Sequence, residues 1–122
     1  MKAFSFTSRQ ATDDPTCVIY DLKGYIDAHT VIDFEKAVQG AIESGLKFIV
    51  LDISGLSYVS SAGIGAMMGL SRKLSQSGGD LVLLNPTTKV FTILDGLGFT
   101  KIFKIASSES AAIQLVKSGT AQ

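Results

Sequence analysis

The segment from residue 51 to residue 70, LDISGLSYVSSAGIGAMMGL, constrains the fold of this chain more than any other. It reads as an apolar strand, then a short polar turn, then a helix that opens on Ser60-Ser61-Ala62-Gly63. Free backbone N–H groups and the positive end of a helix dipole meet at such a junction. A phosphate, whether bound or covalently attached, is well accommodated there. The segment therefore predicts a strand-to-helix unit with two hydroxyl groups at its junction.

Strand and helix patterns alternate along the rest of the chain. Phe4 and Phe6 indicate a half-buried first strand. A turn is expected at residues 13–15, followed by a second strand over residues 16–26 that ends near Gly24. These two strands are expected to pair antiparallel. Later strands are expected over residues 47–53, 81–84 and 101–105. Four helices are expected. The first begins after an N-cap at Thr30 and ends at Gly45, and the second covers residues 62–77. The third begins at residues 85–87 and ends at Gly96 and Gly98, and the fourth begins at a cap at Ser107 or Ser108 and continues through Val116. Such alternation predicts right-handed crossovers and a mixed, mostly parallel sheet with helices packed against it.

The helical spacing also predicts which residues face the core. The expected inner face of the helix over 62–77 is Ile64, Met67, Met68, Ser71 and Leu74, and that of the next helix is Val90, Phe91 and Leu94. For both methionines, core packing is favoured over an adaptable protein interface. Asp52 and Ser54, which precede the helix over residues 62–77, are expected to close the end of the strand before it and the turn that follows that strand.

The composition limits the classes of function. The chain has 122 residues, which suits one domain with a single core, and 46% of them are hydrophobic. Basic and acidic residues number 11 each, so no long-range attraction to nucleic acid or to an anionic membrane is expected. Its apolar runs are too short for membrane insertion, no signal peptide is evident, and the lone Cys17 is expected to be a buried core thiol. A cytoplasmic protein is expected.

No conventional active site can be assembled from these residues. The single histidine, His29, has no second metal ligand at a recognisable spacing, so neither a metal nor another cofactor is expected. No P-loop precedes a helix. Gly63, Gly65 and Gly69 lack the register of a dinucleotide-binding loop. The sequence therefore favours a binding protein over an enzyme.

The serines and glycines at the helix start remain open to two interpretations. One serine can serve as an ordinary N-cap, which contributes about 1 kcal/mol, but a cap needs only one hydroxyl. Gly63, Gly65 and Gly69 each lower helix propensity by roughly 1 kcal/mol relative to alanine. We expect a helix to tolerate them only where something approaches it closely, either its own sheet or a partner.

The same segment resembles the signature of STAS domains, which are shared by sulfate transporters and anti-sigma factor antagonists. The family pattern is a strand with Asp-x-Ser-x-hydrophobic, then a Ser/Thr-containing turn before Gly-hydrophobic-Gly. The residues that match it are Asp52, Ser54, Leu56, Val59, Ser61, Gly63 and Ile64. Residues 24–28, 78–83 and 94–103 are similar to flanking family elements, so the resemblance covers nearly the whole chain. It implies one α/β STAS-like domain over residues 1–122, with a mixed, mostly parallel sheet of about five strands and about four helices.

The resemblance also implies a function. In the bacterial antagonists of this family, a serine in that turn is phosphorylated by a partner that is both a kinase and an anti-sigma factor. The unmodified domain binds this partner, the phosphorylated form releases it, and a serine phosphatase restores the first state. A non-enzymatic regulator of transcription, as in a stress response, is thus implied, with a GHKL-type serine kinase and a PPM-type phosphatase as partners. The implied partner-binding residues are Asp27, Ser60, Ser61, Ala62, Gly63, Ile64, Gly65 and Met67.

The sequence departs from the family pattern at the turn. Relatives often have Asp-Ser-Ser-Gly or Asp-Ser-Thr-Gly, where this chain has Ser60-Ser61-Ala62-Gly63. Because Ala62 has no hydroxyl group, Ser61 is the expected phosphate acceptor, with Ser60 as the second choice. The alternative function is that of a phosphorylation-independent STAS accessory subunit of a transport ATPase or another signalling complex.

Overall fold

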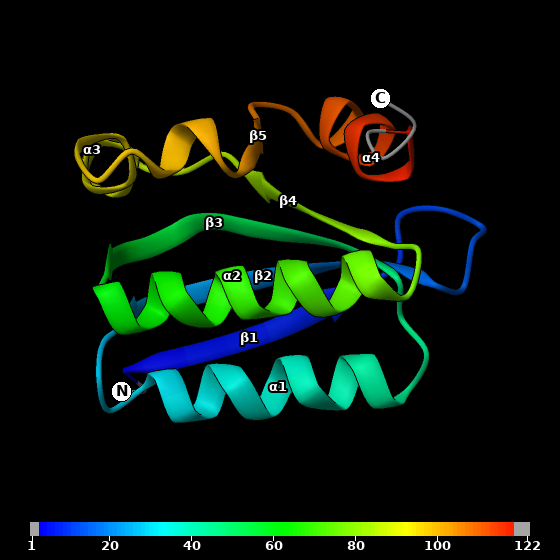
Figure 1. Ribbon diagram of the computed structural model, residues 1–122, viewed down its shortest axis with the longest axis horizontal. Helices are drawn as coiled ribbons and strands as arrows, with labels where there is room; N and C mark the ends of the chain where they lie inside the picture. The colour runs from blue at the N-terminus through cyan, green and yellow to red at the C-terminus, as the bar shows by residue number, and fades with distance from the viewer. Residues whose placement is uncertain (1–2, 119–122) are drawn as a thin grey trace.

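A computed structural model describes residues 3–118 of the chain (Figure 1). Its strands are β1 (Phe4–Arg9), β2 (Cys17–Ile26), β3 (Phe48–Val59), β4 (Asp80–Leu84) and β5 (Lys104–Ala106). Its helices are α1 (Val31–Glu43), α2 (Ser61–Gln76), α3 (Thr88–Gly96), the short 3-10 helix η1 (Phe99–Lys101) and α4 (Glu109–Ser118). The strands form one sheet in the order β1-β2-β3-β4-β5, in which only β1 is antiparallel to its neighbour. The predicted fold class is confirmed.

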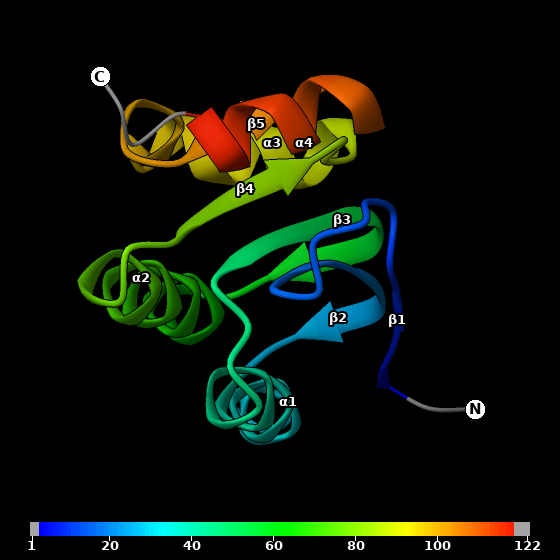
Figure 2. The same ribbon diagram turned by 90° about the vertical axis from the view of Figure 1, so that its right-hand side faces the viewer.

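The two faces of the sheet are covered by different helices. Helices α1 and α2 pack side by side on one face, and α4 packs on the other (Figure 2). The larger core cluster lies under α1 and α2 and includes Phe34, Leu51 and Leu74. The smaller cluster lies under α4 and includes Cys17, whose thiol pKa is raised by burial. The expectation of a buried core cysteine is confirmed.

The strand over residues 47–53 was predicted too short. β3 continues to Val59, because it pairs in parallel with the last residues of β2 across two register shifts. Leu56 and Val59 are buried on this extension, while Ser54 is exposed beside them. Asp52 and Ser54 therefore lie within the strand and do not close it. The Asp52 Oδ1 atom accepts hydrogen bonds from the backbone N–H and hydroxyl of Ser54, which makes a local polar loop on the strand surface.

Several smaller predictions are also corrected. Leu70, not Ser71, lies on the buried face of α2, and Met68 is only half-buried. Phe91 is exposed on α3 because it lies to one side of the buried stripe formed by Val90 and Leu94. Residues 101–103, predicted to be strand, belong to η1 and the turn after it, so β5 is short.

Candidate functional site

The candidate site lies where β2 and β3 end and where α2 begins. The parallel pairing of the two strands places Ile26 beside Val59. The Ser60 N–H donates to the Ile26 carbonyl at 2.8 Å, so the loop that leaves β2 is held next to the start of α2. Asp27 and Ser61, which are distant in sequence, thereby flank one backbone hydrogen bond at the carboxyl edge of the sheet.

The structure gives the two serines different roles. The Ser60 Oγ atom accepts from the Gly63 N–H at 3.2 Å, and the Ser60 carbonyl accepts from the Ile64 N–H at 2.9 Å. Ser60 is therefore the N-cap of α2 and is half-buried. Ser61 is the first helical residue and its side chain is exposed. One of the two hydroxyl groups is thus occupied by the fold, and the other is presented to solvent.

The backbone around Ser61 favours negative charge. An α-helix leaves its first N–H groups without helical partners. Here the Ser60 N–H bonds to Ile26 and the Gly63 N–H bonds to Ser60, which leaves the amides of Ser61 and Ala62 at the surface. The first turn of α2 contains no acidic side chain to occupy these donors. An anion attached at Ser61 would meet free donors and the positive helix end.

Asp27 orders the loop beside this junction. Its Oδ1 atom accepts from the backbone N–H groups of Thr30 and His29, each at 2.9 Å. These hydrogen bonds, that from Thr30 first, hold the pKa of the Asp27 carboxyl below its ordinary value. Thr30 precedes α1 as expected, but its hydroxyl bonds to the Asp27 N–H and the Tyr25 carbonyl and caps no helical amide. Asp27 is therefore a structural element of the site as well as a part of its surface.

The remaining predicted partner-binding residues divide into two groups. Ala62 and Gly65 are exposed along α2. Gly63, Ile64 and Met67 are buried in the core of the free chain, so they lie beneath the predicted surface. A Cβ atom at Gly63 would lie 2.7 Å from Ile26 Cγ2 and 2.8 Å from Val59 Cγ2, whereas one at Gly65 would meet nothing within 4 Å. The close approach expected at Gly63 is therefore to its own sheet.

Comparison with known proteins identifies the family to which this fold belongs. The family model of the STAS domain matches residues 8–112, which span β2 to β5 and the whole junction at Ser60 and Ser61. The chain belongs to the STAS domain family. The family resemblance expected from the sequence is confirmed.

Several proteins similar to this STAS domain are named anti-sigma factor antagonists. It is 35% identical over 85 residues to an anti-sigma F factor antagonist of Lysinibacillus sphaericus, which covers 66% of this chain and 72% of the relative. The structure of the antagonist SpoIIAA in its unphosphorylated form superposes with a TM-score of 0.73 at 27% identity, over 91% of this chain and 96% of that one. The phosphorylated form of SpoIIAA from Bacillus gives 0.67 at 26% identity, over 91% and 99%.

The structure shows a groove beside the candidate site that the sequence interpretation missed. It lies between α1 and α2, has a volume of about 310 Å³, and runs from Ala62 past Gly65 and Gly69. Glu35 and Gln39 of α1 form the opposite wall. The signal was present in the sequence, because small residues recur at helical spacing from Ala62 onward.

No helix among residues 3–118 is long and apolar enough to cross a membrane.

Proposed function

We propose that this STAS domain is an anti-sigma factor antagonist of the cytoplasm, that it binds a GHKL-type serine kinase with anti-sigma activity, and that phosphorylation of Ser61 weakens this complex. The antagonist role is supported by the names of its relatives in Lysinibacillus and Bacillus. The observation that carries the assignment of Ser61 is the division of roles at the junction. Ser60 caps α2, and Ser61 is exposed at its first turn.

The unmodified surface suits protein binding. Ser61, Ala62 and Gly65 form an exposed stripe of small, uncharged residues along α2, and the groove between α1 and α2 continues it. A partner helix or loop can approach the α2 backbone closely because no large side chain stands in the way. Glu35 and Lys73 at the walls of the groove offer one charge of each sign to orient the partner.

Phosphorylation would change this surface without refolding the domain. A phosphate on Ser61 brings about −1.5 to −2 charges and three acceptor oxygens. The free amides of Ser61 and Ala62 and the absence of an acid in the first turn accommodate the group in the free domain. In a complex, contact with the partner would remove water from the same dianion, and the free-energy cost of this desolvation disfavours binding. A PPM-type serine phosphatase would restore the unmodified state.

Ser60 is the weaker candidate for modification. Its Oγ atom accepts the Gly63 amide and the residue is half-buried. A kinase would have to break the N-cap, at a cost of about 1 kcal/mol, before it could reach this hydroxyl.

Phosphopeptide mapping of the protein from its own cells, in growth and under stress, tests this proposal. We expect a phosphate on Ser61 whose occupancy changes with condition, and a serine kinase that co-purifies with the unmodified form. The absence of phosphate under every condition, together with co-purification of a membrane transport ATPase, would overturn the switch and establish the accessory-subunit alternative.

A further inference from the structure

The first strand leaves one edge of the sheet open. β1 pairs on one side with β2 and has no strand on its other side within residues 3–118. Such an edge carries a row of unpaired N–H and C=O groups, which natural proteins usually protect with charges, prolines, bulges or a covering element.

The register shows which backbone groups face outward. Ala3 and Tyr25 form a hydrogen-bonded position, because the Tyr25 N–H donates to the Ala3 carbonyl at 2.9 Å. Hydrogen-bonded and non-hydrogen-bonded positions alternate along an antiparallel pair. With the register Phe4 to Gly24 through Arg9 to Ile19, the N–H and C=O groups of Phe4, Phe6 and Ser8 therefore point away from β2.

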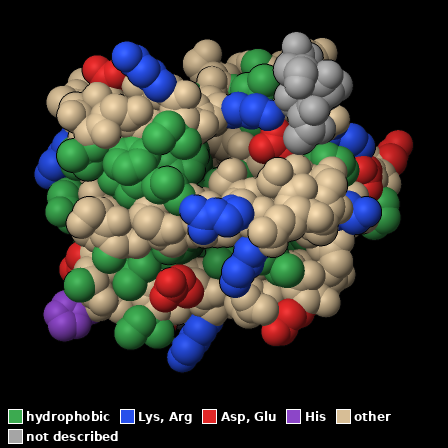
Figure 3. Space-filling model, viewed as in Figure 1, with side chains coloured by type: hydrophobic (Ala, Val, Ile, Leu, Met, Phe, Trp, Pro, Cys, Tyr) green, Lys and Arg blue, Asp and Glu red, His purple; other side chains and the backbone are tan. Residues whose placement is uncertain are grey.

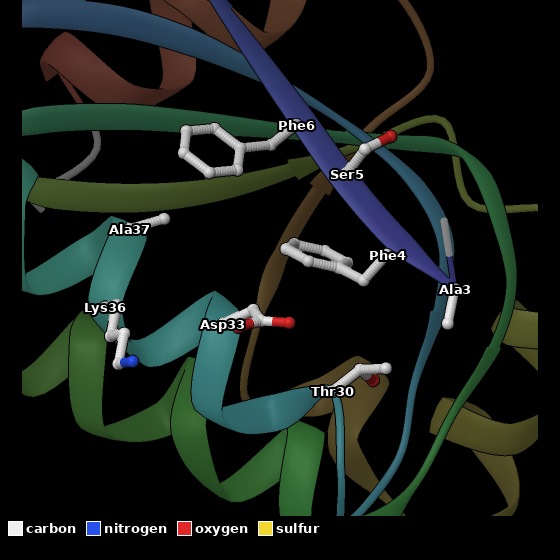
Figure 4. Close-up of a pocket in the computed structure, with 8 residues that line it drawn as sticks. All are labelled: Ala3, Phe4, Ser5, Phe6, Thr30, Asp33, Lys36 and Ala37. Atoms are coloured by element: carbon white, nitrogen blue, oxygen red, sulfur yellow. The ribbon is translucent and has the colours of Figure 1, made fainter. Parts of the chain in front are cut away.

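A cavity with two aromatic side chains in its wall lies beside this edge, between β1 and α1 (Figure 4). Its volume is about 640 Å³, and Phe4 and Phe6 from β1 lie across from Asp33, Lys36 and Ala37 of α1. The Phe4 ring is buried and packs edge-on against Phe34. The Phe6 ring packs on Tyr20 but remains 42% exposed. A large aromatic side chain is thus left partly uncovered next to unpaired backbone groups.

The usual edge protection is missing from this strand. From Phe4 to Ser8 it contains no proline and no charged residue, and its pairing with β2 has no register shift. The one charge, Arg9, is held at the far end by Asp21 and Glu109. Residues 4–8 of β1 themselves therefore present no charge, proline or bulge against a second strand.

We propose that β1 pairs antiparallel with β1 of a second copy of this chain, in a two-fold symmetric dimer centred on Phe6. This register opposes Phe6 to Phe6 and Phe4 to Ser8, so every outward backbone group finds a partner, in about six hydrogen bonds. The alternation of side chains places both Phe6 rings on the α1 face and opposes Ser5 to Thr7 on the other face. The strand is therefore self-complementary in backbone, apolar side chains and hydroxyl groups, and the two Arg9 side chains lie at opposite ends.

The dimer leaves the site at Ser61 free in both copies. The two-fold axis reverses the direction of the second sheet, so the carboxyl ends of β2 and β3 point to opposite ends of the joined sheet. Each copy can then hold its own partner.

Sedimentation velocity of the full chain tests the proposal. The chain concentration is varied between about 10 μM and 1 mM, because a small interface binds weakly. We expect a concentration-dependent dimer of twice the chain mass. Phe6→Lys places two cations opposite each other at the axis and should weaken the dimer by about tenfold or more. Ser8→Pro removes an outward N–H that the monomer does not use, so it should block pairing while the thermal stability of the monomer is kept.

Ile102→Lys is the matched control. Hydrophobic side chains also gather on the surface between α3 and α2 (Figure 3), where Ile102 is 62% exposed beside Met68 and Phe103. This variant should dimerise like the wild type. A wild-type chain that stays monomeric throughout, or a dimer that survives both β1 variants or is lost with Ile102→Lys, would overturn the proposal.

Discussion

Replacing Gly63 by alanine should destabilise this domain although alanine is the better helix former. Gly63 lies in the first turn of α2, where a Cβ atom would be 2.7 Å from Ile26 Cγ2 and 2.8 Å from Val59 Cγ2. Both neighbours are β-branched and almost completely buried, with 0% and 1% exposure, so neither can rotate into free space. The extra methyl group must therefore push α2 away from the ends of β2 and β3.

A matched control isolates the size of this effect. Overpacking a well-filled core costs about 1–3 kcal/mol, and replacing a helical glycine by alanine returns about 1 kcal/mol. Gly65→Ala receives the same gain without a clash, because its Cβ atom would meet nothing within 4 Å. We therefore expect Gly65→Ala to be more stable than the wild type, and Gly63→Ala to be less stable than Gly65→Ala by about 1–3 kcal/mol.

Urea unfolding followed by circular dichroism measures both free energies of unfolding. The slopes of the two transitions should agree, since neither change alters the surface exposed on unfolding. Equal stabilities of the two variants would refute the claim that α2 is seated on the sheet through Gly63.

The other predictions concern the residues around the junction. Ser60→Ala should lower the free energy of unfolding by about 1 kcal/mol through loss of the N-cap, while Ser61→Ala leaves it unchanged, as thermal unfolding would report; equal losses would contradict the assigned roles. The pKa of Asp27 is depressed in the folded state, so its carboxylate stabilises the fold above its unfolded pKa, and this contribution is lost as the pH falls through the folded pKa. Asp27→Asn retains the Oδ1 acceptor, so its melting temperature should depend less on pH than that of the wild type between about pH 5 and pH 2; parallel curves would contradict this. Gly65→Leu should fill the groove between α1 and α2 and weaken partner binding about tenfold or more, measured by calorimetry, without loss of stability; undiminished affinity would exclude the groove.

The order and type of the elements could be predicted because their signals are local. Alternating apolar patterns, Pro and Gly punctuation and a Ser cap each act within a few residues. The extension of β3 to Val59 could not be predicted in this way. Its polar residues resemble a turn, and only pairing with β2 across two register shifts makes them a strand.

The candidate site could be predicted in part. The two serines and the helix start were evident, but the choice of Ser60 as the cap needed the Gly63 amide in place. The glycines could not be separated by sequence, because their helix propensities are the same. Gly63 lies against Ile26 and Val59, whereas Gly65 lies in the open groove, and this distinction arises only from tertiary packing.

The central claim is that charge on Ser61 governs partner binding. Calorimetric titration of the kinase partner with the wild type, Ser61→Ala and Ser61→Asp tests it most directly. We expect Ser61→Ala to bind like the wild type and Ser61→Asp to bind at least about tenfold more weakly, although the carboxylate at the start of α2 leaves the thermal stability of the free domain equal to or above that of the wild type. Equal affinities of the two variants would contradict the claim.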